Sequence, residues 1–174
     1  DIKINKNREN FDLDTPLFLS QEDIINDNYE IRINVSLNDR IILKKICVDK
    51  TLLENILDLP RGIEFGSNSE KIHDSFKENS YKIIFGKNIQ RYEINFENKY
   101  CFFEDNKSTF KQIDYYTNEK LLIQRIRNLS LHRRIIATYD NDKYLCTNTL
   151  RMGILTNHSY NIKYILTLLN STLV

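Results

Sequence analysis

The sequence predicts an α+β domain: a curved, mostly antiparallel β-sheet with flanking helices and a C-terminal helix. Several short segments alternate between apolar and polar residues, helix signals occur early and late in the chain, and no internal repeat is present. Alternation with a period of two is typical of half-buried strands, whereas apolar residues three and four apart are typical of helices. A chain of 174 residues is long enough to bury a substantial core.

The first part of the chain combines a polar segment with one strand and one helix. Residues 1–27 have few periodic apolar positions, so we interpret them as an arm or connector that precedes a domain at 28–174. Apolar and polar residues alternate from Tyr29 to Val35, which predicts a strand. Ser36 is a suitable N-cap for a helix that ends at about Ile46.

The middle of the chain alternates turn signals with short apolar segments. Thr51–Leu57 has the spacing of a capping box and predicts a short helix stopped by Pro60, with a strand as the alternative. A loop with two glycines follows at 61–68, and residues 69–80 are polar, as in a short helix or an insertion. Further strands are expected at Tyr81–Phe85, Ile94–Phe96, Tyr100–Phe103 and Leu121–Ile126.

The last part of the chain carries the clearest turn and helix signals. Asp140–Lys143 separates two apolar runs, Arg133–Tyr139 and Tyr144–Leu155, and predicts a β-hairpin. Asn161 is a suitable N-cap for a final helix, which we expect to leave the domain. Its apolar stripe consists of Ile162, Ile165, Leu168, Leu169 and Leu173.

Charge is distributed unevenly, although the net charge is only +1. Residues 1–80 contain 11 Lys and Arg against 16 Asp and Glu, a balance of −5, whereas residues 81–174 contain 14 against 8, a balance of +6. From 120 to 138 there is no carboxylate, and the cationic side chains are Lys120, Arg125, Arg127, Arg133 and Arg134, with His132 beside them. Such a one-sided positive field attracts phosphate, although cation runs also occur on ordinary solvated faces.

The cysteines and the chain ends bear on the cellular setting. Cys47, Cys101 and Cys146 are far apart and odd in number, which fits a reducing cytoplasm and neither a disulfide framework nor a metal knuckle. No apolar run approaches the ~20 residues that span a bilayer, so no membrane partner is expected. Asp1 and Val174 look like cuts, so we expect the chain to be truncated at both ends from a larger enzyme.

The sequence lacks the residue patterns of several catalytic sites. Adenine methyl transfer needs an aromatic clamp and an amide or carboxylate acceptor, usually Asn/Asp-Pro-Pro-Tyr/Phe, and neither Pro16 nor Pro60 fits this motif. The four glycines form no nucleotide-binding fingerprint. A small Mg²⁺-dependent nuclease is one alternative, because Asp74, Glu97 and Lys99 match a loose carboxylate and lysine spacing. We otherwise expect no catalytic residue, no metal site and no cofactor in this chain.

Five segments in a fixed order carry a family resemblance. They are Arg61-Gly-Ile-Glu-Phe-Gly66, Gly86-Lys-Asn-Ile-Gln-Arg-Tyr92, Glu119-Lys-Leu-Leu-Ile-Gln-Arg-Ile-Arg127, Ala137-Thr-Tyr-Asp140 with Tyr144, and Tyr164-Ile-Leu-Thr-Leu-Leu-Asn-Ser171. Together they resemble the TaqI-like C-terminal specificity domain, which is the target-recognition part of many Type IIG restriction-modification enzymes and of BREX phage-defence methyltransferases. Residues 69–80 depart from the shorter pattern of that family.

The resemblance implies a non-catalytic domain whose partner is double-stranded DNA. The parent would be an adenine-specific DNA methyltransferase, with or without endonuclease activity. A methyltransferase domain of the same polypeptide would bind S-adenosylmethionine, with Mg²⁺ if the parent also cleaves, while this domain reads the major groove. The candidate DNA-binding residues are Arg61, Glu64, Ser67, Asn68, Lys87, Asn88, Gln90, Arg91, Arg125, Arg127, His132, Arg133 and Arg134.

Two roles divide these residues, because phosphate contacts position a protein and base-edge contacts select a sequence. We expect phosphate contacts from Lys87, Arg125, Arg127, Arg133 and Arg134. The loop residues are the candidate base readers, although Asn88 and Arg91 equally suit a loop-shaping role. The candidate stacking residues, which more often belong to cores and sheets, are Tyr92, Tyr115, Tyr116, Tyr139 and Tyr144. A protein-interaction module, docked through the acidic first half, is the remaining alternative.

Overall fold

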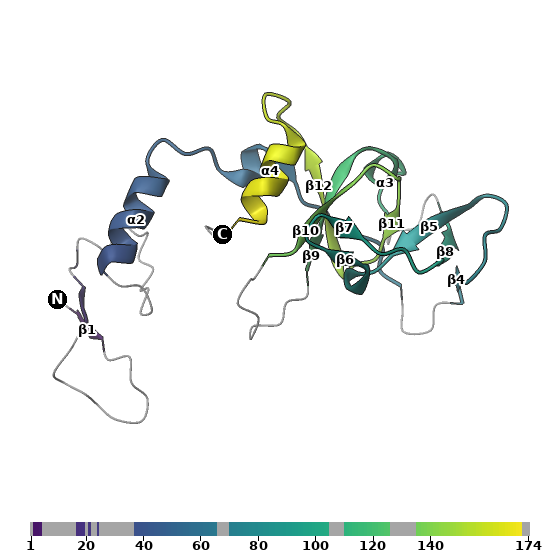
Figure 1. Ribbon diagram of the computed structural model, residues 1–174, viewed down its shortest axis with the longest axis horizontal. Coiled ribbons are helices and arrows are strands. Elements are labelled where there is room, and N and C mark those ends of the chain that lie inside the picture. Colours follow the sequence, from purple (N-terminus) through teal and green to yellow (C-terminus); the bar gives the residue numbers. More distant parts are fainter. Residues whose placement is uncertain are drawn as a thin grey trace. The chain divides into compact units, whose positions relative to one another are not determined.

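The computed structural model of the chain describes residues 2–4, 17–19, 21, 24, 37–65, 70–104, 110–125 and 135–171 (Figure 1). The chain divides into two compact units, Asp1–Lys50 and Thr51–Val174, and each unit is described by itself. Among the described helices, none combines the length and the apolar character that crossing a membrane requires.

The first unit contains a short pair of strands and a longer helix. β1 (Ile2–Ile4) pairs antiparallel with β2 (Leu17–Leu19), within the segment that the sequence analysis treats as an arm. α2 (Leu37–Cys47) has an acidic residue in its first turn and two lysines in its last turn, which complement the helix dipole. The helix expected between Ser36 and about Ile46 is confirmed. The strand expected before it lies outside the described residues.

The second unit contains two four-stranded sheets, ordered β10-β9-β12-β3 and β11-β5-β8-β4, and a separate β6–β7 hairpin. Every pairing is antiparallel except that of β11 with β5. The α+β class, with mostly antiparallel strands, flanking helices and a C-terminal helix, is confirmed. The described elements are the 3₁₀ helix η1 (Leu53–Asn55), β3 (Leu57–Asp58), β4 (Ile72–His73), β5 (Ser80–Ile84), the 3₁₀ helix η2 (Gly86–Asn88), β6 (Ile89–Gln90), β7 (Glu93–Ile94), β8 (Tyr100–Phe102), α3 (Asp114–Thr117), β9 (Lys120–Gln124), β10 (Ala137–Asp140), β11 (Leu145–Cys146), β12 (Leu150–Leu155) and α4 (Ile162–Leu169).

β9 lies at the centre of the first sheet because both of its faces are apolar. Leu122 packs into a core that draws side chains from both four-stranded sheets, whereas Leu121 packs into a second core together with α4. β10 places Tyr139 opposite Leu121, and β12 places Gly153 opposite it on the other side. A Cβ at Gly153 would lie only 3.1 Å from the Cβ of Leu121, so the glycine makes room for this large side chain.

Aromatic rings and two thiols fill the core shared by the sheets. The Phe103 ring packs edge-on against Phe110 and Tyr116, with ring centroids 5.2 Å and 5.9 Å apart. Burial raises the pKa of both the Cys101 and the Cys146 thiol to about 12, so both stay protonated near neutral pH.

α4 packs on the first sheet and closes the second core (Figure 1). The Asn161 side chain accepts a hydrogen bond from the backbone N–H of Lys163 at 2.9 Å, which confirms the expected N-cap. Buried Asn170 bonds to both backbone groups of Ala137, which donates to Oδ1 at 3.1 Å and accepts from Nδ2 at 2.9 Å. The helix therefore stays with the domain instead of leaving it, because its stripe finds apolar partners on β9 and β10. The buried stripe consists of Ile162, Ile165, Leu166 and Leu169.

The hairpin expected around Asp140–Lys143 is wrong. β10 and β12 both pair with β9 and not with each other, and β11, which follows this turn, joins the other sheet. The Asp140 carboxylate accepts hydrogen bonds from the backbone N–H groups of Asp142 at 2.8 Å and Tyr144 at 3.2 Å. It thereby closes a turn that directs the chain from one sheet to the other.

The segment from Thr51 to Pro60 contains both of the elements that its pattern allowed, each very short. η1 is followed at once by β3, which pairs with β12. The expected capping box does not form, since the N-cap is Leu52 and has no side-chain hydrogen bond. Thr51 instead bonds through its hydroxyl to the Tyr160 hydroxyl at 3.1 Å, which ties the start of this unit to the segment before α4.

Candidate nucleic-acid interface

The first glycine loop lies against the turn between β11 and β12. A Cβ at Gly62 would lie 2.4 Å from the carbonyl oxygens of Cys146 and Thr147, so only glycine permits this close backbone approach. The next residue is fixed by two backbone bonds: Ile63 donates to the Cys146 carbonyl at 2.7 Å and accepts from the Asn148 N–H at 2.8 Å. The β11–β12 turn therefore determines where Arg61 and Glu64 emerge.

The second glycine loop, which begins at Gly86, and the end of β9 reach the same turn. The Gly86 N–H donates to Thr149 Oγ1 at 2.8 Å, and the Gly86 carbonyl accepts from Gln124 Nε2 at 3.1 Å. Arg125 donates its backbone N–H to the Thr149 carbonyl at 2.9 Å and a guanidinium N–H to the Asn148 carbonyl at 3.0 Å. Three segments that are remote in sequence thus converge on the β11–β12 turn, which the sequence analysis did not single out.

Three arginines occupy one face of the first sheet at this end. Arg61 forms an antiparallel bridge opposite Arg151, and Arg151 lies opposite Ile123 in the pairing of β12 with β9. Alternate residues of a strand share a face, so Arg125 lies on the same face as Ile123. We call Arg61, Arg125 and Arg151 the arginine face.

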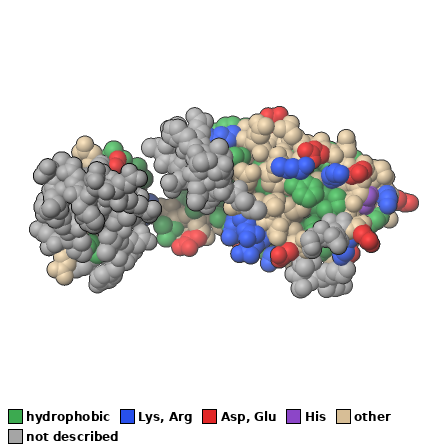
Figure 2. All heavy atoms as spheres, turned by 90° about the horizontal axis from the view of Figure 1, so that it is seen from below, with side chains coloured by type: hydrophobic (Ala, Val, Ile, Leu, Met, Phe, Trp, Pro, Cys, Tyr) green, Lys and Arg blue, Asp and Glu red, His purple; other side chains and the backbone are tan. Residues whose placement is uncertain are grey.

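The charge of the arginine face is not compensated by any carboxylate of the described residues. Arg151 donates to the Leu59 carbonyl at 2.9 Å, Arg125 also bonds to a carbonyl, and Arg61 is exposed. Like charges directly opposite each other in a sheet repel, so the pair of Arg61 and Arg151 creates a positive potential that favours an anion. Figure 2 shows blue Lys and Arg side chains at several places on the visible surface of this unit, with red Asp and Glu side chains among them.

The β6–β7 hairpin brings further candidate residues to the same end of the sheet. Gln90 pairs with Glu93, which leaves Arg91 and Tyr92 as the two-residue turn. Arg91 donates from Nη2 to the carbonyl of Ile135 at 3.2 Å, immediately before β10. The side chains of Gln90 and Tyr92 are exposed, so the tip of the hairpin presents polar and aromatic groups to solvent.

Two of the candidate residues are engaged within the fold. Asn88 is only 2% exposed, and its Oδ1 accepts a hydrogen bond from the Phe85 N–H at 2.8 Å, which shapes η2. Lys87 forms an ion pair with Glu97 at 2.6 Å, and the hydrogen bond from Lys87 lowers the pKa of Glu97 below its ordinary value. In this structure Asn88 therefore shapes a loop, and the charge of Lys87 is partly neutralised.

Lys120 does not belong to the exposed cation-rich stretch in which the sequence placed it. Its side chain is fully buried, with Nζ 2.5 Å from Asp140 Oδ2 and 2.5 Å from the Tyr116 carbonyl oxygen. A buried charge requires such partners, because its desolvation is otherwise very unfavourable. Lys120 thus stabilises the fold and contributes little to the field at the interface.

Of the remaining candidate residues, one is described by the structure and the others are not. Glu64 is exposed on the first glycine loop. The candidates that lie outside the described residues are Ser67, Asn68, Arg127, His132, Arg133 and Arg134. Their expected contacts therefore stay predictions.

The structure separates the five candidate stacking tyrosines. Tyr116 and Tyr144 are buried, and Tyr115 and Tyr139 are partly buried, as expected of core and sheet residues. Tyr92 differs, because 58% of the residue is exposed at the tip of the β6–β7 hairpin. Tyr92 is therefore the stacking candidate that the structure favours.

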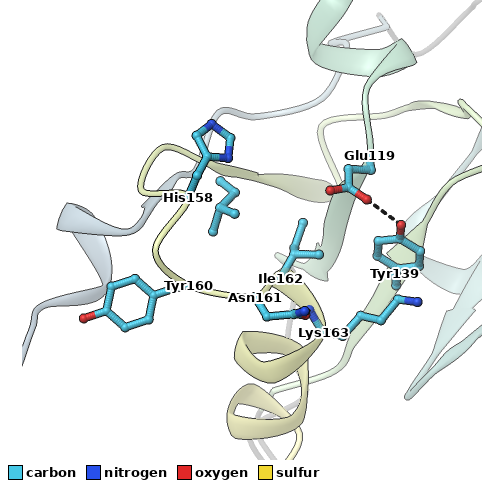
Figure 3. Close-up of a pocket in the computed structure, with 8 residues that line it drawn as sticks. Glu119, Tyr139, His158, Tyr160, Asn161, Ile162 and Lys163 are labelled. Carbon is cyan, nitrogen blue, oxygen red and sulfur yellow. Dashed lines mark hydrogen bonds between the residues drawn. The ribbon is translucent and has the colours of Figure 1, made fainter.

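A pocket of about 320 Å³ lies at the opposite end of the first sheet, where β10 and β12 end and α4 begins (Figure 3). The Tyr139 hydroxyl donates to Glu119 at 2.6 Å, which raises the pKa of the phenol, and Lys163 Nζ lies 5.2 Å from the centre of the Tyr139 ring. These contacts link the N-terminus of α4 to the strands beneath it. The lining residues are Glu119, Tyr139, Leu155, His158, Tyr160, Asn161, Ile162 and Lys163.

The residues of the alternative nuclease site do not assemble into a metal site. Lys99 forms an ion pair with Asp74, whereas Glu97 forms one with Lys87. The two carboxylates thus face different lysines. Throughout the part of the chain that the structure describes, no group of three His, Cys, Asp or Glu side chains is arranged to hold a metal ion. This geometry gives the nuclease alternative no support.

The fold and the site define a basic α+β module whose loops converge on one end of a sheet. The model of the TaqI-like C-terminal specificity domain family matches residues 81–174, which is more than half of the chain, and the chain belongs to this family. Such a specificity domain is a non-catalytic, DNA-recognising part of a restriction-modification system. The match includes the second glycine loop, β9 and α4 but not the first glycine loop. No curated protein matches the chain.

Proposed function

We propose that this chain is the sequence-specific DNA recognition domain of an adenine-specific DNA methyltransferase, which acts in a cytoplasmic restriction-modification or phage-defence system. The observation that carries the proposal is the arginine face, whose three arginines lie beside two loops that pack against the β11–β12 turn. Double-stranded DNA is the partner. We assign the binding of S-adenosylmethionine, and of any Mg²⁺, to a methyltransferase domain of the same polypeptide.

Within this proposal the arginine face positions the domain on the DNA backbone. Arg61 is one of the loop residues expected to read bases, but its place opposite Arg151 favours a phosphate contact. The two adjacent guanidinium groups present several N–H donors to the oxygens of neighbouring phosphates, and their mutual repulsion is relieved when phosphate binds. Base reading then belongs to side chains on the glycine loop and the hairpin, namely the exposed Glu64 and Gln90 and the partly buried Arg91.

The salt dependence of DNA binding tests the phosphate role. We expect Arg61→Gln with Arg151→Gln to weaken binding to all duplexes about equally and to reduce the slope of log K against log salt by about 2, since each lost phosphate contact removes roughly 0.9. The measurement is the fluorescence anisotropy of labelled duplexes of several sequences over a series of salt concentrations. Glutamine removes the charge and retains an N–H donor and part of the aliphatic stem at each position, so we expect the fold to be preserved.

A charge-matched control separates local contact from general attraction. Lys71→Gln with Lys163→Gln removes the same charge from exposed positions outside the arginine face, and we expect the slope to stay unchanged. An equal reduction in both double variants, or a loss confined to one DNA sequence, would contradict the phosphate role of the arginine face.

A further inference from the structure

Tyr92 has a backbone conformation that is unusual for its residue type. Its φ of 67° lies in the left-handed region, which glycine adopts without strain and which Asn and Asp tolerate better than other residues. The other described non-glycine residues with positive φ are Asp49, Asn79, Asn98 and Lys143. Tyr92 is thus the one aromatic residue among them, at a turn position where glycine or asparagine is normal.

The turn that contains Tyr92 is fixed to the first sheet through its backbone and its other turn residue. The Tyr92 N–H donates to the Ala137 carbonyl at 3.2 Å, and the Arg91 side chain donates to the Ile135 carbonyl at 3.2 Å. Both acceptors lie at the start of β10, which is an edge strand of the sheet. These contacts hold the strained conformation in place.

The Tyr92 ring is largely exposed and is not among the described residues of either core. The residue is 58% exposed, and the structure gives its ring no aromatic, cation–π or hydrogen-bond contact with another described residue. Phe103, by contrast, packs against several rings of the core. The ring is therefore accessible to a partner, on a turn whose backbone glycine or asparagine would adopt with less strain.

Tyr92 lies at the same end of the first sheet as the arginine face. Its backbone partner Ala137 is opposite Ile123 in the register of β10 with β9, and Arg125 follows Ile123 by two positions. DNA whose phosphates contact the arginine face therefore passes close to the tip of the β6–β7 hairpin.

We propose that Tyr92 is a DNA-binding residue whose ring stacks on a nucleobase of the bound DNA. This inference rests on the proposed DNA-recognition function and adds to it a contact with a base. A base that is unstacked from a neighbour, as at a kinked step of a duplex, can stack strongly on an aromatic ring whatever its identity, and the short turn limits the conformational freedom that the ring loses on binding. The strain is kept because a relaxed residue at this position has no ring to offer.

A fluorescent reporter at position 92 tests the contact directly. The chain contains no tryptophan, so Tyr92→Trp introduces a single indole at the hairpin tip. The probe is a pool of duplexes selected from a random-sequence library for binding to the wild-type chain. We expect the pool to quench the indole emission, because a stacked base quenches it. Tyr164→Trp is the matched control, since Tyr164 is 55% exposed on α4, and its emission should stay constant.

Three substitutions separate a DNA contact from a structural role. Tyr92→Gly relieves the backbone strain and removes the ring, so we expect affinity for the selected pool to fall on the order of tenfold. Its thermal midpoint should be no lower than that of the wild type. Tyr92→Asn should behave in the same way, whereas Tyr92→Phe should retain the affinity.

The outcomes distinguish this inference from the proposed function. If the wild-type chain binds the selected pool but the indole emission does not change, the stacking role of Tyr92 is wrong and DNA recognition stands. The role is also wrong if Tyr92→Gly lowers the thermal midpoint and leaves the affinity unchanged. If no duplex is retained by the wild-type chain at low salt, the proposed function fails and this inference fails with it.

Discussion

Lys120 and Arg125 lie close together in sequence, but the fold gives their charges opposite roles. Lys120 begins the central strand and is buried against Asp140, whereas Arg125 follows the same strand and is exposed on the arginine face. The sequence shows a run of cations, but it does not show that a carboxylate from another strand neutralises one of them. The residue-level charge pattern therefore predicted an exposed cation correctly at Arg125 and incorrectly at Lys120.

The buried ion pair gives the first stability prediction. Asp140→Ala should lower the free energy of unfolding by about 3–5 kcal/mol, because it leaves the buried ammonium of Lys120 without a carboxylate and removes the acceptor of two backbone N–H groups. Urea unfolding measures the loss. Glu97→Ala, which breaks the exposed pair with Lys87, is the control and should cost less than about 1 kcal/mol. Similar losses in both variants would show that burial does not govern the strength of these pairs.

The buried thiols and one phenol predict how stability depends on pH. Burial raises the pKa of Cys101, Cys146 and Tyr116 to about 12, from ordinary values of 9.0 for the thiols and 10.0 for the phenol. Above about pH 9 the unfolded chain loses these protons while the folded chain keeps them, so the free energy of unfolding falls as pH rises. The slope approaches about 1.4 kcal/mol per pH unit for each group. Urea titrations across this range should show a shallower decline for Cys146→Ala than for the wild type, and an identical slope would disprove the assignment.

At the scale of elements, local patterns predicted the positions of strands better than their partners. The short apolar segments near Tyr81–Phe85, Tyr100–Phe103 and Leu121–Ile126 contain β5, β8 and β9. The expected hairpin at Asp140–Lys143 failed because both faces of β9 are apolar, so β10 and β12 are stabilised by flanking it. Pairing of this kind depends on distant residues, which a turn signature does not report.

The same limit applies to the candidate site. Arg125, Gln90 and Arg91 were predicted, and the structure brings them to one end of the first sheet. Arg151 was missed because in sequence it is a single cation within an apolar strand. Its one signal was its alternation with buried Leu150 and Met152, which places it on the other face.

The two glycine loops predict unequal sensitivity to a single methyl group. Gly62→Ala should cost about 3 kcal/mol, because the added Cβ would lie 2.4 Å from backbone carbonyl oxygens of the β11–β12 turn. Gly86→Ala should cost about 1 kcal/mol or less, since its closest neighbours are atoms of Thr149 at 3.3 Å. Urea unfolding of the two variants gives the comparison. A larger loss for Gly86→Ala would mean that the β11–β12 turn does not fix the first loop.

At the scale of the whole molecule, the family match is shorter than the unit that the packing requires. The match begins at residue 81, yet Ile63 is fully buried in the core between the sheets, and Leu57 is 2% exposed in the core beneath α4. β3, which also precedes the match, pairs with β12, and Arg61 belongs to the arginine face. Both the stability and the proposed site thus draw on residues before the matched segment.

This difference predicts how two fragments behave. Residues 51–174 contain every buried apolar residue of both cores, so this fragment should unfold cooperatively and keep the salt-dependent DNA binding of the full chain. Residues 81–174 lack Ile56, Leu57 and Ile63, whose loss costs about 2–4 kcal/mol each and approaches the whole stability of a typical domain. We therefore expect no cooperative urea transition from the shorter fragment, with near-UV circular dichroism as the second readout. A cooperative transition of the 81–174 fragment at the same urea midpoint would show that the first glycine loop and β3 are not needed for folding. It would also show that the rest of the interface folds without Arg61.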